Sequence, residues 1–121
     1  MRKAWTVEVT DVFSDWWRAL EEREQENVDA AIMLLAAHGV ELGYPHSSSV
    51  KGSRHGHLRE LRVQSGGRPL RLLYAFEPRR TAILLVGGDK TGDNRFYDRM
   101  IRLADGLYED HLDELRREGR I

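Results

Sequence analysis

Apolar residues in the first third of the chain recur at spacings typical of one strand and two helices. The segment Trp5–Val9, WTVEV, alternates apolar and polar residues and predicts a strand. Asp11 is expected to cap a helix after it. Its buried face would carry residues spaced i, i+3, i+4, i+7, namely Phe13, Trp16, Trp17 and Leu20.

A second helix is indicated by the same spacing further along the chain. Its apolar positions are Val28, Ala31, Ile32 and Leu35. His38 supplies a cation at the expected C-terminus, and Gly39 is typical of a residue that ends a helix with positive φ. The following segment, residues 41–56, is rich in Gly, Ser and Pro. It predicts a long connection, which in a compact domain often has a functional role.

The middle of the chain predicts a meander of antiparallel strands. Two turn sequences, SGGR and EPRR, separate three apolar runs. These runs are Leu58–Gln64, Leu70–Phe76 and Ala82–Val86. The last run is apolar throughout, as expected of a central strand covered on both faces.

The C-terminal region predicts a helix over this sheet. Asp93 is expected to cap it, with a break allowed at Gly106 and a second helix through Leu112 and Leu115. Its apolar stripe would be Phe96, Met100, Leu103 and Leu107. We therefore expect an α+β fold over residues 1–121 as a single domain. An N-terminal strand and a helical hairpin would pack on a small antiparallel sheet, followed by the C-terminal helix.

The turn at Gly66-Gly67 fixes the predicted register of the first two strands of the meander. Residues equally distant from the turn then face each other, giving the pairs Leu61–Leu72, Val63–Leu70 and Arg59–Tyr74 on one face. On the other face Arg62 lies directly opposite Arg71. Like charges in that position are destabilising, so an anion is expected between them. The alternative is neutralisation by Glu60, Glu77 or a helix carboxylate.

Charge is strongly segregated along the chain, although the net charge is only -1. Residues 50–80 carry 8 basic and 2 acidic side chains, whereas residues 1–49 carry 4 and 9. A local positive field of this kind recruits phosphate polyanions, and the alternative is a solvated basic surface. Further phosphate contacts are expected from loop and strand cations, namely Lys51, Arg54, His55, Arg59, Arg68 and Arg95.

Several classes of protein are disfavoured by the sequence. There is no cysteine, which excludes a disulfide framework and a thiolate zinc site. His55 and His57 point the same way on an extended segment, but no third ligand is evident, so we expect neither metal nor cofactor. GGDKTGDN precedes a helix and can offer backbone N–H groups to an anion, although it lacks P-loop spacing. No apolar stretch indicates a signal peptide or a membrane span, and we expect a cytoplasmic protein.

The order of elements and four short strings resemble a known family. ELRV, SGGR, RLLY and FYDRMI occur in sequence within residues 60–101. Together they resemble the RelE/ParE superfamily of bacterial toxins, and within it the phage-derived HigB-type branch. The resemblance covers nearly the whole chain. It implies a RelE-like microbial RNase fold, metal-independent cleavage of messenger RNA on the ribosome, and a cognate antitoxin, expected to be a helix-turn-helix DNA-binding protein.

The resemblance also implies roles for individual residues. Arg62 stands where RelE-like enzymes have a lysine or arginine on the sheet, and Arg71 matches the arginine of their Y-R-x-x-Y strand. Tyr97 matches the C-terminal aromatic residue that stacks on or activates the substrate nucleotide.

Two positions depart from the family pattern. Lys90 falls near a pair of basic residues after the last strand, but Thr91 occupies the second position, so Arg95 is a candidate substitute. Glu60 stands where the RelE branch has a basic residue. These departures bear on the proton-transfer roles more than on RNA binding.

Metal-free RNA cleavage requires a base for the 2′-hydroxyl, a cation for the phosphate and an acid for the 5′-oxygen. Arg62 and Arg71 suit the phosphate, because guanidinium groups stay charged and offer paired donors. The base candidates are His57 and Glu60, ahead of His55 and Tyr97, and the acid candidates are Lys90 and Arg95. A tyrosine ordinarily has a pKa of ~10, so Tyr97 suits base stacking better.

Three functions are compatible with this fold. The first is a ribosome-dependent mRNA endonuclease, and the second is a ParE-like inhibitor of DNA gyrase without catalysis. The third is a toxin-like partner or co-repressor of a DNA-binding antitoxin. Fold alone does not separate them. An endonuclease requires Arg62, Arg71, Lys90 and Tyr97 to lie together, whereas a gyrase binder does not.

Overall fold

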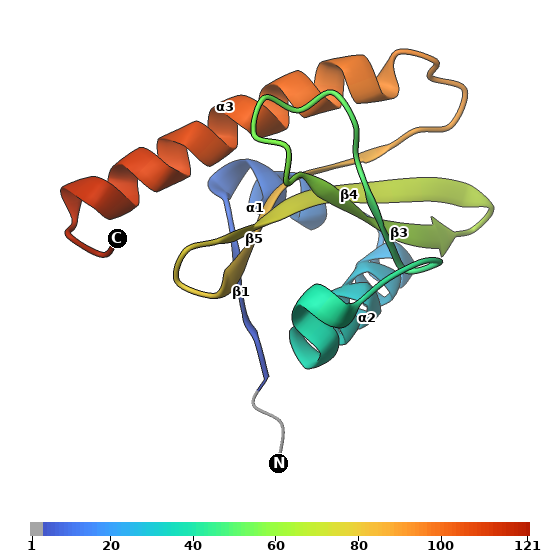
Figure 1. The fold of residues 1–121 in the computed structure, drawn as a ribbon. Coiled ribbons are helices and arrows are strands. Elements are labelled where there is room, and N and C mark those ends of the chain that lie inside the picture. The colour runs from blue at the N-terminus through green and yellow to red at the C-terminus, as the bar shows by residue number, and fades with distance from the viewer. Residues whose placement is uncertain (1–3) are drawn as a thin grey trace.

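The computed structural model describes residues 4–121, which form a five-stranded sheet with helices on both faces (Figure 1). Along the chain the elements are β1 (Thr6–Val9), α1 (Asp11–Arg18), α2 (Glu22–His38), the 3-10 helix η1 (Gly39–Glu41), β2 (Ser47–Ser49), β3 (Arg59–Ser65), β4 (Arg68–Glu77), β5 (Thr81–Asp89) and α3 (Phe96–Arg117). The predicted α+β class and the predicted order of elements are confirmed. Within the described residues, no helix is long and apolar enough to cross a membrane.

The strands lie in the order β1-β5-β4-β3-β2. The hairpin of β3 and β4 has the register predicted from its turn, with Arg62 opposite Arg71. Two features were not predicted. Strand β1 pairs with β5 in parallel, so the sheet is not entirely antiparallel. The connection 41–56 contains β2, which extends the sheet beyond β3. This strand was not predicted because a run of three serines lacks the apolar alternation by which strands are recognised.

The sheet is buried on both faces because helices cover each of them. On one face, Leu61, Leu72 and Tyr74 pack with Phe13 of α1 and Val28 of α2. On the other face, α3 covers Leu73, Ala75, Ile83 and Leu85 with an apolar surface that includes Phe96, Ala104 and Tyr108. In Figure 1, α3 accordingly runs across one side of the sheet while α2 lies on the other. The second face is the one toward which Arg62 and Arg71 project.

Helix α1 begins one residue earlier than the sequence pattern predicts. Thr10, not Asp11, is its N-cap, because the Thr10 hydroxyl accepts a hydrogen bond of 3.0 Å from the Phe13 N–H. The same hydroxyl donates to the Leu85 carbonyl at 2.6 Å, which joins the start of the helix to β5. Threonine and aspartate are both good N-cap residues, so local sequence did not decide between adjacent candidates.

Helix α3 continues through Gly106 without the predicted break. Its buried stripe includes Ile101, Ala104 and Tyr108, whereas Leu103 is exposed. Asp93 lies before the N-cap residue, Arg95, and accepts that residue's N–H at 3.0 Å. The helix is therefore rotated relative to the predicted stripe.

Candidate functional site

Glu60 lies at the centre of a polar cluster between β3 and α3. Side chains alternate along a strand, so Glu60 and Arg62 both project to the face covered by α3. The Glu60 carboxylate is buried and accepts two hydrogen bonds from hydroxyl groups. Tyr97 of α3 donates to Oε1 at 2.6 Å, and Ser48 of β2 donates to Oε2 at 2.8 Å. One carboxylate thus joins three elements that are distant in sequence.

The two opposed arginines flank this same carboxylate. Nε of Arg71 lies 3.6 Å from Glu60 Oε1, and Nη1 of Arg62 lies 3.5 Å from Oε2. Arg71 is buried, and its Nη1 donates to the Leu70 carbonyl at 3.0 Å. The structure therefore favours the alternative considered above: Glu60, rather than a bound anion, offsets the repulsion between the guanidinium groups. Arg62 differs from Arg71 because 30% of its side chain is exposed.

Lys90 and Tyr97 complete the cluster from the other side. The Lys90 ammonium lies 5.3 Å from the centroid of the Tyr97 ring, a distance at which cation and ring attract each other. Burial raises the pKa of the Tyr97 phenol, and the hydrogen bond to Glu60 raises this pKa further, although Arg71 opposes the effect. The phenol therefore stays protonated at neutral pH. It can donate a hydrogen bond or stack, but it is poorly suited to act as a base.

His57 lies away from the cluster. It is exposed and lines a groove with Phe76, Pro78 and Tyr108, at the end of β4 opposite to Arg71. Phe76 is the fifth residue after Arg71 along β4, which corresponds to roughly 16 Å at the rise of a β-strand. The structure thus brings Glu60, but not His57, to the guanidinium groups.

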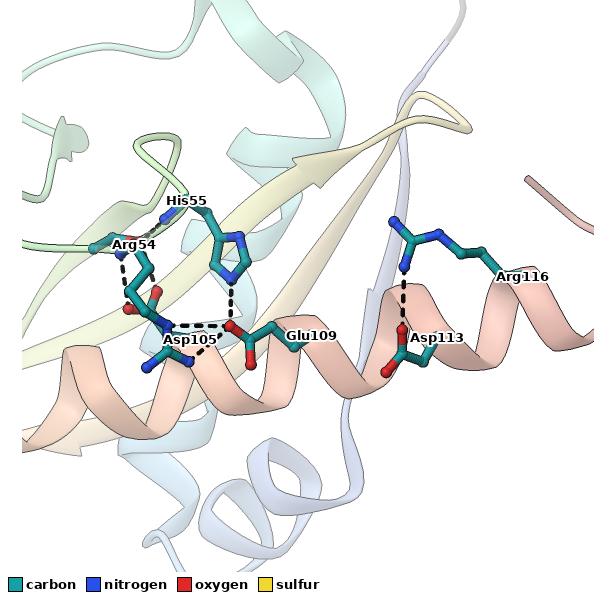
Figure 2. A network of polar contacts seen from close by, with 7 residues as sticks. Arg54, His55, Asp105, Glu109, Asp113 and Arg116 are labelled. Carbon is teal, nitrogen blue, oxygen red and sulfur yellow. Dashed lines mark hydrogen bonds and ion pairs between the residues drawn. The ribbon is translucent and has the colours of Figure 1, made fainter.

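Arg54 and His55 are tied to helix α3 (Figure 2). The buried Asp105 accepts hydrogen bonds from the Ser53 hydroxyl at 2.6 Å and the Arg54 N–H at 3.0 Å. The Arg54 guanidinium donates to Glu109 at 2.7 Å, which raises the pKa of Arg54, and His55 Nε2 lies 3.2 Å from the same oxygen. In this conformation, both side chains hold the connection against α3.

Arg68 and Arg59 also have partners within the chain. Arg68 forms ion pairs with Glu24 of α2 and with Asp89, the latter at 3.2 Å. Arg59 donates to the hydroxyl groups of Ser47 and Ser49, both at 3.2 Å. Arg68 thus joins the start of β4 to α2 and β5, and Arg59 joins β3 to the edge strand β2. Neither belongs to the Glu60 cluster.

The remaining predicted cations are exposed. Lys51 lines a small pocket with Tyr97, Ile101 and Arg102, and so borders the cluster. Arg95, the N-cap residue of α3, lines a shallow hollow with Arg102. Lys51 can therefore contact a substrate that covers Tyr97. The position of Arg95 favours Lys90 over it for a role beside Glu60.

Two residues of the cluster were missed from the sequence, and both come from the connection 41–56. Ser48 holds Glu60, as described above. Tyr44 lies beside Arg62, whose guanidinium carbon is 5.4 Å from the centroid of the Tyr44 ring. The only signal for either residue was the unusual length of the connection. Within residues 4–121, no group of three or more His, Cys, Asp or Glu side chains is arranged to hold a metal ion.

Comparisons of the sequence with known proteins identify relatives. The profile of the family described as phage-derived protein Gp49-like matches residues 15–109. In Mycobacterium tuberculosis (strain ATCC 25618 / H37Rv), the putative toxin HigB2 is 42% identical over 110 residues, which cover 89% of this chain and 54% of HigB2. The putative toxin HigB3 is 42% identical over 98 residues, covering 80% of this chain and 84% of HigB3. The chain thus spans about half the length of HigB2.

Solved structures share the fold at low sequence identity. The isolated Escherichia coli RelE toxin has a TM-score of 0.56 and 11% identity, covering 83% of this chain and 99% of RelE. A mutant of that toxin in the free state has a TM-score of 0.57 and 12% identity, covering 77% and 90%. A chain of the intact E. coli RelBE toxin-antitoxin complex has a TM-score of 0.53 and 12% identity, and the match covers 70% of this chain and 95% of that one. These similarities show a common fold.

Proposed function

Because the chain belongs to the phage-derived Gp49-like family, and to the HigB-type branch of the RelE/ParE superfamily, we propose that it is a toxin that cleaves messenger RNA on the ribosome. The observation that carries this proposal is the convergence of Arg62 and Tyr97 on the Glu60 carboxylate, with Lys90 against the Tyr97 ring. A gyrase inhibitor without catalysis does not require a cation and an aromatic ring beside this carboxylate. The similarity to RelE of the RelBE complex supports a cognate antitoxin as partner.

Glu60 is the proposed base. Its two oxygens already accept hydrogen bonds from hydroxyl groups, which is the interaction that a ribose 2′-hydroxyl would make. Glu60 would take the 2′-hydroxyl proton as the 2′-oxygen bonds to phosphorus and the bond from phosphorus to the 5′-oxygen breaks. Lys90 would give a proton to that leaving oxygen. The products are a 2′,3′-cyclic phosphate and a 5′-hydroxyl.

The remaining residues of the cluster would bind and orient the substrate. Arg62 is partly exposed and can donate to the phosphate, where a guanidinium stabilises developing negative charge. Tyr97 would stack on a base of the single strand, as aromatic residues do in RNA-binding proteins. Arg71 is a positioning residue in this scheme, because its buried guanidinium holds Glu60 and does not reach the substrate.

Expression of the chain without an antitoxin gene tests this function. We expect incorporation of labelled amino acids to stop before incorporation of labelled thymidine, and messenger RNA fragments with 5′-hydroxyl ends to accumulate. Lys90→Ala and Arg62→Ala should strongly weaken both effects at unchanged protein level. They are preferable to Arg71→Ala, which removes a buried charge and therefore perturbs folding as well. If thymidine incorporation stopped first, the gyrase-inhibitor function would replace this one.

A further inference from the structure

The connection between η1 and β3 forms one wall of the Glu60 cluster. Strand β2 of this connection pairs with β3. The His46 carbonyl accepts the N–H of Arg62 at 2.9 Å, and Ser48 donates to Glu60 at 2.8 Å. The connection is therefore fixed against the strand that carries Glu60 and Arg62. The side chains of Tyr44 and Ser48 lie beside the cluster as a result.

Tyr44 presents an aromatic ring to solvent from this wall. The residue is 77% exposed, so its ring contributes little to the hydrophobic core. Its ring contacts Arg62, whose guanidinium carbon lies 5.4 Å from the ring centroid. Because Arg62 also approaches Glu60 at 3.5 Å, the ring is anchored next to the cluster while most of its surface stays free.

The two oxygens of Glu60 divide the cluster into two similar halves. Beside Oε1 lie the Tyr97 hydroxyl and the buried Arg71, and the Lys90 ammonium lies 5.3 Å from the centroid of the Tyr97 ring. Beside Oε2 lies Arg62, and Tyr44 contacts Arg62 in turn. Each half thus pairs an aromatic ring with a cation, and the two pairs approach the carboxylate from different elements. A single-stranded nucleic acid has the matching repeat of bases and phosphates.

We propose that Tyr44 and Arg62 form a second nucleobase-binding site, on the side of Glu60 away from Tyr97. One base of the single-stranded RNA stacks on Tyr44 and another on Tyr97, so the phosphodiester between them crosses Glu60. RNA fits this surface better than a protein segment does, because each of the two rings has a cation beside it, Arg62 at Tyr44 and Lys90 at Tyr97, and these cations can contact phosphates. The inference rests on the proposed function and extends it to the way in which the substrate is held.

Binding of an RNA that cannot be cleaved tests the inference directly. The probe is a short, fluorescently labelled single strand of 2′-O-methyl RNA, and binding is measured by fluorescence anisotropy at two salt concentrations. Loss of one stacked base weakens binding by about tenfold, so Tyr44→Ala should raise the Kd by that factor. Tyr44→Phe and Tyr44→Trp should stay within about twofold of the wild type, because both keep a ring. Met33→Ala is the control, since Met33 is comparably exposed on α2, beyond the opposite face of the sheet.

The outcomes separate this inference from the proposed function. Unchanged RNA binding by Tyr44→Ala, or no RNA binding by the wild type, would overturn the second base site even if translation stops in cells. RNA binding that depends on Tyr44 would support the site even if DNA replication stops first in cells. That order of events would contradict only the proposed function. If Tyr44→Ala keeps RNA binding but loses a protein partner in pull-down, the ring belongs to a protein interface and the inference fails.

Discussion

The phenol of Tyr97 donates a 2.6 Å hydrogen bond to the Glu60 carboxylate, and this bond joins the first turn of α3 to the middle of the sheet. The bond fixes both groups at once. It orients the Tyr97 ring beneath Lys90, and it holds one oxygen of Glu60 beside the buried Arg71. A substitution at either residue therefore changes the geometry of the other.

Replacing Tyr97 separates the role of its ring from that of its hydroxyl. Tyr97→Phe keeps the stacking surface but frees Glu60, so messenger RNA cleavage should fall by about tenfold, the effect of one lost hydrogen bond to a charged group. Tyr97→Ala also removes the stack and should lower the rate by about a further tenfold. Primer extension on ribosome-bound messenger RNA gives both rates. If the two variants were equally inactive, the hydroxyl itself would take part in the chemistry.

The raised pKa of Tyr97 predicts a late ionisation at alkaline pH. Burial is the main cause and the Glu60 carboxylate adds to it, so the neutral phenol is favoured in the folded state. This stabilisation is complete below the unfolded pKa of about 10 and is lost as the pH rises through the higher folded pKa. Burial also raises the pKa of Tyr108. A titration followed by tyrosinate absorbance should thus show that Tyr97 and Tyr108 ionise late. Tyr97→Phe should remove the late step of Tyr97 and keep that of Tyr108.

Glu60 is expected to matter for stability as well as for cleavage. Glu60→Ala leaves the buried Arg71 without its counter-charge, and breaking such a pair from one side costs about 3–5 kcal/mol. Urea unfolding measures the loss. Glu26→Ala, an exposed acid on α2, should change stability by less than about 0.5 kcal/mol. A double variant, Glu60→Leu with Arg71→Met, should recover much of the stability and none of the cleavage, because it removes both buried charges together.

A comparison of His57, a base candidate from the sequence, with Lys90, the proposed acid, tests whether the chemistry lies at the Glu60 cluster. His57→Ala should leave messenger RNA cleavage within about twofold of the wild type, because His57 lies in the groove at the other end of β4. Lys90→Ala should lower cleavage by about 10²-fold, which is the lower end of the range for the loss of a proton-transfer group. A large loss in His57→Ala, with normal folding by circular dichroism, would place the chemistry elsewhere.

The parts of this site that sequence predicted are those set by local rules. The turn at Gly66-Gly67 and the alternation of β3 and β4 fix which residues face each other, so the pair Arg62 and Arg71 could be derived before any coordinates. The segregation of basic and acidic residues along the chain is likewise visible in the sequence alone.

The parts that sequence could not predict depend on contacts between distant segments. Ser48 and Tyr97 reach Glu60 from 12 and 37 residues away, and no periodicity relates these positions. Leu103 and Ile101 both fit an apolar helical stripe, and only packing against the sheet selects Ile101 for burial. The charges of Arg62 and Arg71 predicted a need for negative charge, and the sequence left open whether a bound anion or a carboxylate such as Glu60 supplies it. In the structure Glu60 lies beside both arginines.

Residues 50–58, which lead into β3, should loosen when their attachment to α3 is removed (Figure 2). Asp105 is 2% exposed and accepts hydrogen bonds from the Ser53 hydroxyl and the Arg54 N–H. Asp105→Ala leaves these donors without partners, so it should cost about 1–3 kcal/mol in urea unfolding and speed amide hydrogen exchange across residues 50–58.

Asp113 is the matched control for Asp105, because it lies on the same helix and carries the same charge. Its ion pair with Arg116 is 3.1 Å long, and both side chains are 60% exposed. Surface pairs of this kind contribute about 0–1 kcal/mol, so Asp113→Ala should leave amide exchange at 50–58 unchanged. Lys51 sits on the connection and borders Tyr97, so RNA binding should weaken in Asp105→Ala but not in Asp113→Ala. Equal behaviour of the two variants would show that the connection keeps its position without α3, and that Lys51 does not depend on this attachment.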